Sequence, residues 1–215
     1  VRAAQDSVTP VLEAAGVLGT MPNIPANRLS GQLDARGPGF AISAEELSGV
    51  RALEVGARML RAGELDVALV GAVDLSCESV HEAALASVTG AARAAGDAAV
   101  VCVLMRAETA RAAGLPCIAL LDTSPVDPAT QPSVSGSSPA QFGHAHAAAG
   151  LLDVVTTALR SRTSQQPAAL HLEGLLGAGS VVHVLPGDQA PLLAGVLAAL
   201  SSSGPSLTLP AHLPS

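Results

Sequence analysis

The hydrophobic pattern of the chain switches repeatedly between the spacing of amphipathic helices and the continuous apolar runs of buried strands. Helices are expected at residues 1–18, 27–33, 44–62, 77–88, 107–113, 144–160 and 191–200. Strands are expected at residues 40–42, 66–73, 98–105, 116–121, 168–176 and 180–185. Helices that alternate with apolar strands predict an α/β fold built in layers.

The clearest amphipathic pattern covers residues 44–62. Its apolar stripe consists of Leu47, Val50, Leu53, Ala57 and Leu60, and arginines and glutamates occupy the opposite side. Gly63 is expected to end this helix as a C-cap. The nearly continuous apolar run at residues 66–73 then predicts a strand that is buried on both faces.

Two stretches interrupt this alternation. Residues 123–140 are rich in Pro, Ser, Gly and Asp, a composition typical of a loop. Residues 201–215 are rich in Ser and Pro and have no periodicity, which indicates a linker. We therefore expect one domain over residues 1–200, with the loop inside it, followed by a linker at 201–215.

The composition narrows the class of protein. Of the 215 residues, 49% are apolar, which is enough for a large core. Lysine, Trp and Tyr are absent, the only aromatic residues are Phe40 and Phe142, and the formal net charge is −7. These features argue against a nucleic-acid partner and against an anionic membrane. No apolar run suits a membrane span and no signal peptide begins the sequence, so a cytoplasmic protein is expected.

The three cysteines offer no recognisable site. Cys77, Cys102 and Cys117 are odd in number, follow no spacing pattern and stand in apolar segments. They are interpreted as buried thiols rather than disulfide partners or metal ligands.

The segment from Gly37 to Leu53 carries the first candidate site. It reads Gly-Pro-Gly-Phe-Ala-Ile-Ser-Ala-Glu-Glu-Leu-Ser-Gly-Val-Arg-Ala-Leu, a turn and a short apolar run followed by a helix start. A helix start presents free backbone N–H groups and a positive dipole, which favour a thiolate or an oxyanion. The segment resembles the active-site segment of the β-ketoacyl synthases. When the two are aligned on Gly37, Pro38 and Ser48, the catalytic Cys of that family falls on Glu46.

Other stretches strengthen the resemblance. The run Phe142-Gly-His-Ala-His-Ala-Ala-Ala-Gly is similar to the ketosynthase pattern Gly-His-Thr-Glu-Ala-Ala-Ala-Gly, whose catalytic His matches His144. Residues 21–30, 66–74 and 175–184 match further family segments in the same order, so the similarity covers most of residues 19–185. The resemblance implies a thiolase-like fold of mixed sheets covered by helices.

The chain also departs from that family. A His-Gly-Thr-Gly-Thr motif with a second catalytic His is missing, and a catalytic Lys cannot be present in a chain without lysine. The family also has a longer N-terminal half that begins with a strand. The resemblance therefore implies a truncated thiolase-like fold that lacks most of the catalytic residues.

Glu46 has two interpretations. In the first, Ser43 is an N-cap and Glu46 stands three residues later, so that the two form a capping box at the helix start. In the second, the Glu46 carboxylate lies in an acyl pocket, where it mimics the carboxylate of a malonyl group or acts as a base. The first interpretation is preferred because the capping signature is complete.

The histidines add one candidate. His144 stands near a helix start, where the resemblance implies that it would polarise a malonyl group. The His144 and His146 pair has no carboxylate or Cys at metal-ligand spacing, so no metal is expected. His183 is interpreted as a strand histidine, and His81 and His171 form no recognisable group.

These observations predict a non-catalytic, chain-length-factor-like domain of a bacterial fatty acid or polyketide synthase, most similar to those of polyunsaturated fatty acid synthases. We expect no catalytic residues, cofactor or metal, with Glu46 and His144 as degenerate positions. The expected partners are a ketosynthase or acyltransferase domain of the same synthase and an acyl carrier protein. A dimer is expected to form through the strand at residues 40–42.

The alternative is an enzyme, a malonyl-thioester decarboxylase or acyltransferase that uses Glu46 and His144. A third possibility is that the chain is a piece of a larger synthase whose missing motifs lie elsewhere.

Overall fold

The computed structural model describes residues 13–75, 79–90, 94–123, 133–135, 143–175, 177–187 and 195–199. The chain divides into two compact units, Val1–Ile42 and Ser43–Ser215. The expected domain end at residue 200 and the expected linker at 201–215 lie outside the described residues.

The first unit contains two short helices, α2 (Ala14–Thr20) and α3 (Ile24–Gln32). The expected helix at residues 1–18 is described only from residue 13 onwards. The expected helix at residues 27–33 is confirmed as α3, which begins three residues earlier because Pro25 is tolerated in a first helical turn.

The strand predicted at residues 40–42 is wrong, because these residues form no strand and Phe40 is 48% exposed. A strand is stable only where its backbone groups find partners on a neighbouring strand. An apolar run of three residues is too short to indicate whether such a partner exists. The dimer expected to form through these residues stays a prediction.

The second unit is built on one seven-stranded sheet in the order β1-β2-β7-β3-β6-β5-β4. Its strands are β1 (Val67–Asp74), β2 (Ala98–Arg106), β3 (Ala119–Asp122), β4 (Ser133–Ser135), β5 (Ala168–Glu173), β6 (Gly179–Pro186) and β7 (Gly195–Ala199). Every pairing is antiparallel except that between β4 and β5. Strands and helices in one layered unit confirm the α/β class.

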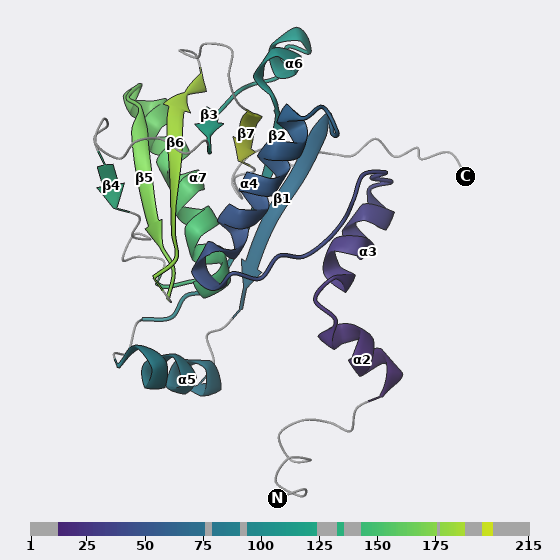
Figure 1. Ribbon diagram of the computed structural model, residues 1–215, viewed down its shortest axis with the longest axis vertical. Helices are drawn as coiled ribbons and strands as arrows, with labels where there is room; N and C mark the ends of the chain where they lie inside the picture. The colour runs from purple at the N-terminus through teal and green to yellow at the C-terminus, as the bar shows by residue number, and fades with distance from the viewer. Residues whose placement is uncertain are drawn as a thin grey trace, which may run out of the picture. The chain divides into compact units, whose positions relative to one another are not determined.

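Two helices cover one face of this sheet, α4 (Ser48–Arg61) and α7 (His146–Ser164), and Figure 1 shows them side by side. Their buried faces form the main core with β1, β2, β5 and β6. A Cβ added to Gly49 would lie 2.6 Å from the Cβ of Leu151, and one added to Gly150 would lie 2.7 Å from the carbonyl oxygen of Glu46. The close approach of α4 and α7 therefore depends on these two glycines.

Most of the expected helices of this unit are confirmed. The predicted helix at 44–62 is a short 3-10 turn, η1 (Glu45–Leu47), that continues into α4. Gly63 follows α4 with φ +74°, as expected of a glycine just past a helix end. The helices predicted at 77–88, 107–113 and 144–160 correspond to α5 (Ser79–Thr89), α6 (Ala107–Ala112) and α7.

The C-terminal helix predicted at residues 191–200 is wrong, because residues 195–199 form strand β7 between β2 and β3. A short, mostly apolar run suits a helix or a buried strand, and periodicity alone does not separate the two. In this fold the backbone partners on both sides decide the conformation. The loop predicted at 123–140 contains β4, and most of it lies outside the described residues.

Strand β1 is not buried on both faces, contrary to the prediction. Ala68 and Val70 face the core, whereas Val67, Leu69 and Val73 are 46%, 48% and 61% exposed. The sequence of residues 67–73 did not reveal this difference, because it is apolar on both faces. Within the described residues, no helix is long and apolar enough to cross a membrane.

Candidate functional site

The candidate site begins at the turn that precedes α4. Ser48 holds this turn, because its Oγ accepts a hydrogen bond from the N–H of Ala44 at 2.9 Å and donates one to the carbonyl of Glu45 at 2.6 Å. The N-cap of the 3-10 turn is Ala44, and it makes no side-chain capping bond. The predicted capping box with Ser43 as the N-cap is therefore wrong.

Glu46 is instead bound to a distant part of the chain. Its Oε2 accepts a hydrogen bond from the backbone N–H of Leu175 at 2.8 Å, and the residue is only 5% exposed. Leu175 belongs to the tight turn between β5 and β6, in which the N–H of Gly174 bonds to the carbonyl of Ala178 at 2.7 Å. The carboxylate thus joins the start of α4 to the β5–β6 turn.

His144 lies next to this carboxylate. Its Nε2 is 3.7 Å from Oε1 of Glu46, and its side chain is 19% exposed. The backbone of His144 is held by residues 94–96: its N–H donates to the carbonyl of Ala94 at 2.7 Å, and its carbonyl accepts from the N–H of Gly96 at 3.1 Å. The sequence placed Glu46 and His144 in one site by resemblance, and the structure brings them together.

Gly143 makes this arrangement possible. It has φ +68°, a conformation that side chains rarely adopt, and an added Cβ would lie 2.5 Å from the carbonyl oxygen of Ala95. Only glycine fits here, so the residue before His144 fixes how the imidazole approaches Glu46.

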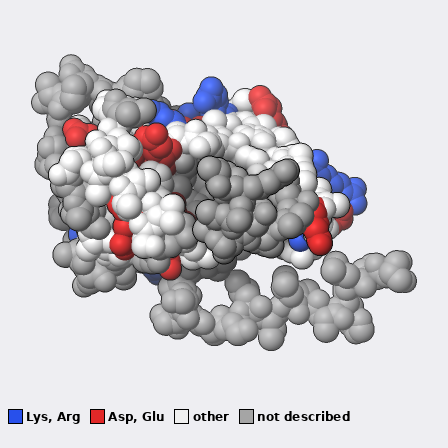
Figure 2. Space-filling view, turned by 90° about the horizontal axis from the view of Figure 1, so that it is seen from below, with Lys and Arg blue, Asp and Glu red and all other residues white. Residues whose placement is uncertain are grey.

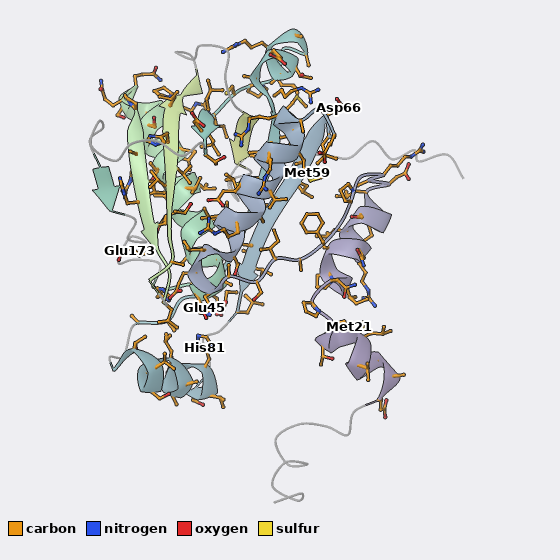
Figure 3. All side chains as sticks on the ribbon, viewed as in Figure 1. Met21, Glu45, Met59, Asp66, His81 and Glu173 are labelled. Carbon is orange, nitrogen blue, oxygen red and sulfur yellow. The ribbon has the colours of Figure 1, made fainter. Side chains whose placement is uncertain are left out.

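Three further residues surround the start of α7, and sequence reasoning did not assign any of them to a site. The Oδ2 of Asp74 accepts a hydrogen bond from the N–H of Ala147 at 3.1 Å. The rings of His81 and His146 meet edge to face with their centroids 5.2 Å apart, and the rings of His144 and His146 lie 6.3 Å apart. In Figure 3 the labelled His81 and Glu45 lie at the same end of the second unit. His81, which sequence reasoning assigned to no group, thus contacts His146.

This group is not arranged as a metal site. Across the described ranges, no three His, Cys, Asp or Glu side chains are placed so that they could hold a metal ion. A shallow hollow on α7, lined by Thr156, Leu159, Arg160, Thr163 and Ser164, lies at the opposite end of that helix from His146.

The cysteines supply no nucleophile at this site. Cys102 is fully buried in β2, and its burial raises the pKa of the thiol to about 12, so the thiol stays protonated at neutral pH. Cys117 is half-buried, and its thiol lies 3.5 Å from the carbonyl oxygen of Ala119. Cys77 lies outside the described residues. The prediction of a buried thiol is confirmed for Cys102.

Other polar side chains of α4 and β6 make structural contacts. The hydroxyl of Ser180 donates to Oε1 of Glu54 at 2.5 Å, and Arg51 donates to Oε2 of the same carboxylate at 2.7 Å. The Ser180 contact joins β6 to α4, and the Arg51 contact lies within α4. His183 is 8% exposed within β6, which confirms that it is a strand histidine.

On the face shown in Figure 2, most of the described surface is uncharged, and acidic and basic side chains are scattered among one another. Among the described side chains on that face, no basic patch of the kind that binds nucleic acid is present.

A comparison with protein families finds one match. Residues 2–100 match the model of the β-ketoacyl synthase N-terminal domain, which confirms the resemblance derived from the motifs at Glu46 and in residues 66–74. No curated protein sequence matches the chain.

Solved structures share the fold. The ishigamide ketosynthase/chain length factor superposes with a TM-score of 0.67 and 17% identity, over 85% of this chain and 68% of that one. The oxazolomycin ketosynthase domain OzmH KS7 of Streptomyces albus JA3453 gives a TM-score of 0.66 and 15% identity, over 90% of this chain and 54% of that one. A ketosynthase of a type II polyketide synthase, solved in complex with its acyl-carrier protein, gives a TM-score of 0.67 and 13% identity. The match covers 81% of this chain and 69% of that one.

The thiolase-like fold expected from the resemblance is thereby confirmed. The chain spans between about half and two thirds of the length of these three structures.

Proposed function

Because the chain is related to the β-ketoacyl synthases over residues 2–100 and shares their fold, we propose that it is a non-catalytic, chain-length-factor-like domain of a fatty acid or polyketide synthase. It works in the cytoplasm as a structural part of the synthase, and polyunsaturated fatty acid synthases are the subclass we favour. Residues 1–200 form this domain and residues 201–215 a linker.

The observation that carries the proposal is the environment of Glu46. A side chain at the position of the family's nucleophile is 5% exposed, and its Oε2 is bound by the N–H of Leu175 at 2.8 Å. A carboxylate that already accepts a backbone hydrogen bond is a poor nucleophile, and it occupies the helix start where an acyl-enzyme oxyanion would be stabilised.

The proposed role is to support dimerisation and to dock a ketosynthase or acyltransferase domain of the same synthase, with an acyl carrier protein as a further partner. The largely uncharged surface of Figure 2 suits protein contacts better than contacts with nucleic acid. The pairing of a ketosynthase with a chain length factor in a similar structure supports this role by analogy.

The experiment that tests this function measures carbon dioxide release from malonyl–carrier protein. The proposal expects no release above the rate without protein, and it expects the chain to co-purify with a ketosynthase or acyltransferase domain of its synthase. His144→Ala and the matched control His171→Ala are expected to behave like the wild type. Release that is lost in His144→Ala and kept in His171→Ala would establish the decarboxylase instead.

A further inference from the structure

The helix α5 depends on a few side-chain contacts for its conformation. It has 11 residues, and none of them is buried. A helix of fewer than about 12–15 residues is only marginally stable in water unless it packs against other elements. Within the described part of the chain, α5 makes no extensive contact with another helix or strand. A change in one of its contacts should therefore affect the whole helix.

One such contact joins α5 to the start of α7. The rings of His81 and His146 meet edge to face with their centroids 5.2 Å apart. Figure 3 shows the labelled His81 on the side of α5 that is nearer to the sheet. His146 is the first residue of α7 and has φ +30°, an uncommon conformation that costs a non-glycine residue free energy. Such strain persists where neighbouring contacts fix the residue, and His81 supplies one of these contacts.

The surroundings of His146 suit a neutral ring. Its Nδ1 atom is buried and has no hydrogen-bond partner. In the neutral ring Nδ1 can remain an acceptor, whereas in the protonated ring it becomes an N–H donor that needs a partner. A buried donor without an acceptor is costly, and more so when it carries a charge. A proton bound at this atom would therefore destabilise the contact.

The contact tolerates one charged ring better than two. A single charged imidazole beside a neutral one meets no like charge within the pair. Two charged rings with their centroids 5.2 Å apart repel each other, and they do so more strongly where water is partly excluded. Histidine changes its charge between about pH 5 and pH 8. The second proton is thus expected to bind as the solution becomes mildly acidic.

Other titratable groups lie around the pair. The Nε2 of His144 is 3.7 Å from Oε1 of Glu46, so a proton on His144 has a carboxylate partner. That proton would place a further positive charge beside His146, because the two rings lie 6.3 Å apart. The other acidic residues on the elements packed here are Glu45, Asp74, Glu82 and Asp97. None of these carboxylates is hydrogen-bonded to Nδ1 of His146, so the charge gained there has no direct partner.

We propose that the contact between His81 and His146 is a pH-sensitive switch. It holds α5 on the start of α7 while the pair carries no more than one proton, and it releases α5 when both rings are protonated. The released state binds more protons, so α5 is held at neutral pH and above and is released as the pH falls. Release uncovers the ring of His146 and leaves α5 without a contact that stabilises it. This switch goes beyond the proposed structural role and does not depend on it.

Hydrogen–deuterium exchange of the whole chain, read by mass spectrometry from about pH 7.5 to about pH 5.5, tests the switch. Peptides of residues 79–89 report on α5, and peptides of residues 151–160 report on the interior of α7, after correction for the intrinsic effect of pH on exchange. The opening constant of α5 is expected to rise by up to about tenfold per pH unit for each extra proton that the released state binds. The interior of α7 should keep its protection over the same range.

His81→Phe keeps an aromatic ring in the contact and removes one of the two charges, so its α5 should stay protected at the acidic end. His171→Phe is the matched control, because it replaces another half-buried histidine, on β5, with the same residue. Its α5 should respond to pH as in the wild type. If His81→Phe does not hold α5 at neutral pH, His146→Phe removes the other charge and is measured in the same way.

Three results would overturn the switch. The first is a wild-type α5 whose protection is the same at both ends of the pH range. The second is a phenylalanine variant that holds α5 at neutral pH and loses it on acidification as the wild type does. The third is a simultaneous loss of protection in α5 and α7, which indicates acid unfolding of the whole unit. None of these results bears on carbon dioxide release, so the proposed function is judged separately.

Discussion

Glu46 and Leu175 stand 129 positions apart in the chain, and Oε2 of the glutamate accepts a hydrogen bond from the leucine N–H at 2.8 Å. This bond crosses from the helix start that carries the ketosynthase resemblance to the turn between β5 and β6. It gives Glu46 a structural contact that links two distant parts of the chain.

The first prediction concerns this bond. Glu46→Ala leaves the N–H of Leu175 without its acceptor in a partly buried turn, so the free energy of unfolding should fall by roughly 1–3 kcal/mol. Glu46→Gln keeps an acceptor oxygen, so its free energy of unfolding should fall by less than that of Glu46→Ala. Urea unfolding followed by circular dichroism measures both, with the exposed Glu64→Ala as control. Equal midpoints for Glu46→Ala and Glu64→Ala would show that the bond contributes nothing.

The second prediction concerns the contact of α4 with α7. A Cβ on Gly150 would lie 2.7 Å from the carbonyl oxygen of Glu46 and 2.8 Å from Cγ2 of Val50. Gly150→Ala must therefore push the helices apart, at a cost of about 1–3 kcal/mol. Gly31→Ala, on a helix where an added Cβ meets nothing within 4 Å, is the control and should not destabilise. The midpoint temperatures of thermal unfolding of the two variants are compared with that of the wild type. An unchanged midpoint for Gly150→Ala would contradict the close packing of α4 against α7 at this glycine.

The third prediction concerns Arg106, which joins the end of α4 to the start of β1. One of its nitrogens donates to the carbonyls of Leu60 and Leu65 at 3.1 and 2.7 Å, and another donates to Asp66 at 2.9 Å. An ammonium group cannot reproduce this fork, so Arg106→Lys should lower the free energy of unfolding by about 1–2 kcal/mol.

Arg58→Lys keeps the charge at an exposed position of α4 and should have little effect in the same urea titration. If Arg106→Lys lowers the free energy of unfolding no more than Arg58→Lys does, the hydrogen bonds of the Arg106 guanidinium contribute nothing to stability.

The fourth prediction is a pH dependence. Burial raises the pKa of the Cys102 thiol from 9.0 to about 12. Between these values the unfolded chain loses this proton and the folded chain keeps it, so the stability falls as the pH rises from about 9 towards 12. The free energy of unfolding of the wild type should thus decline faster over that range than that of Cys102→Ala. Parallel declines in the two proteins would argue against a protonated, buried thiol.

Local patterns predicted the helices well because their signals lie within the helices themselves. The apolar stripe of α4 and the glycine that ends it are read directly from residues 44–63. The β7 strand was mistaken for a helix because its conformation depends on β2 and β3, which are distant in the sequence. The exposed face of β1 was missed for the same reason, since its exposure depends on which elements cover the sheet.

The candidate site was predicted in part. The resemblance located Glu46 and His144, which the structure places 3.7 Å apart. The capping box failed because Ser48, four residues after Ala44, holds the turn in place of Ser43. The contacts of His81 and Asp74 carry no sequence signal, because each reaches the start of α7 from a different element.

The bond between Glu46 and Leu175 has a consequence for any attempt to place a thiol at this helix start. Glu46→Cys would remove the acceptor of the Leu175 N–H, at a cost of roughly 1–3 kcal/mol. That loss is a large part of the stability of a typical domain. A cysteine at position 46 would therefore need a second change in the β5–β6 turn, one that removed this N–H or gave it another acceptor.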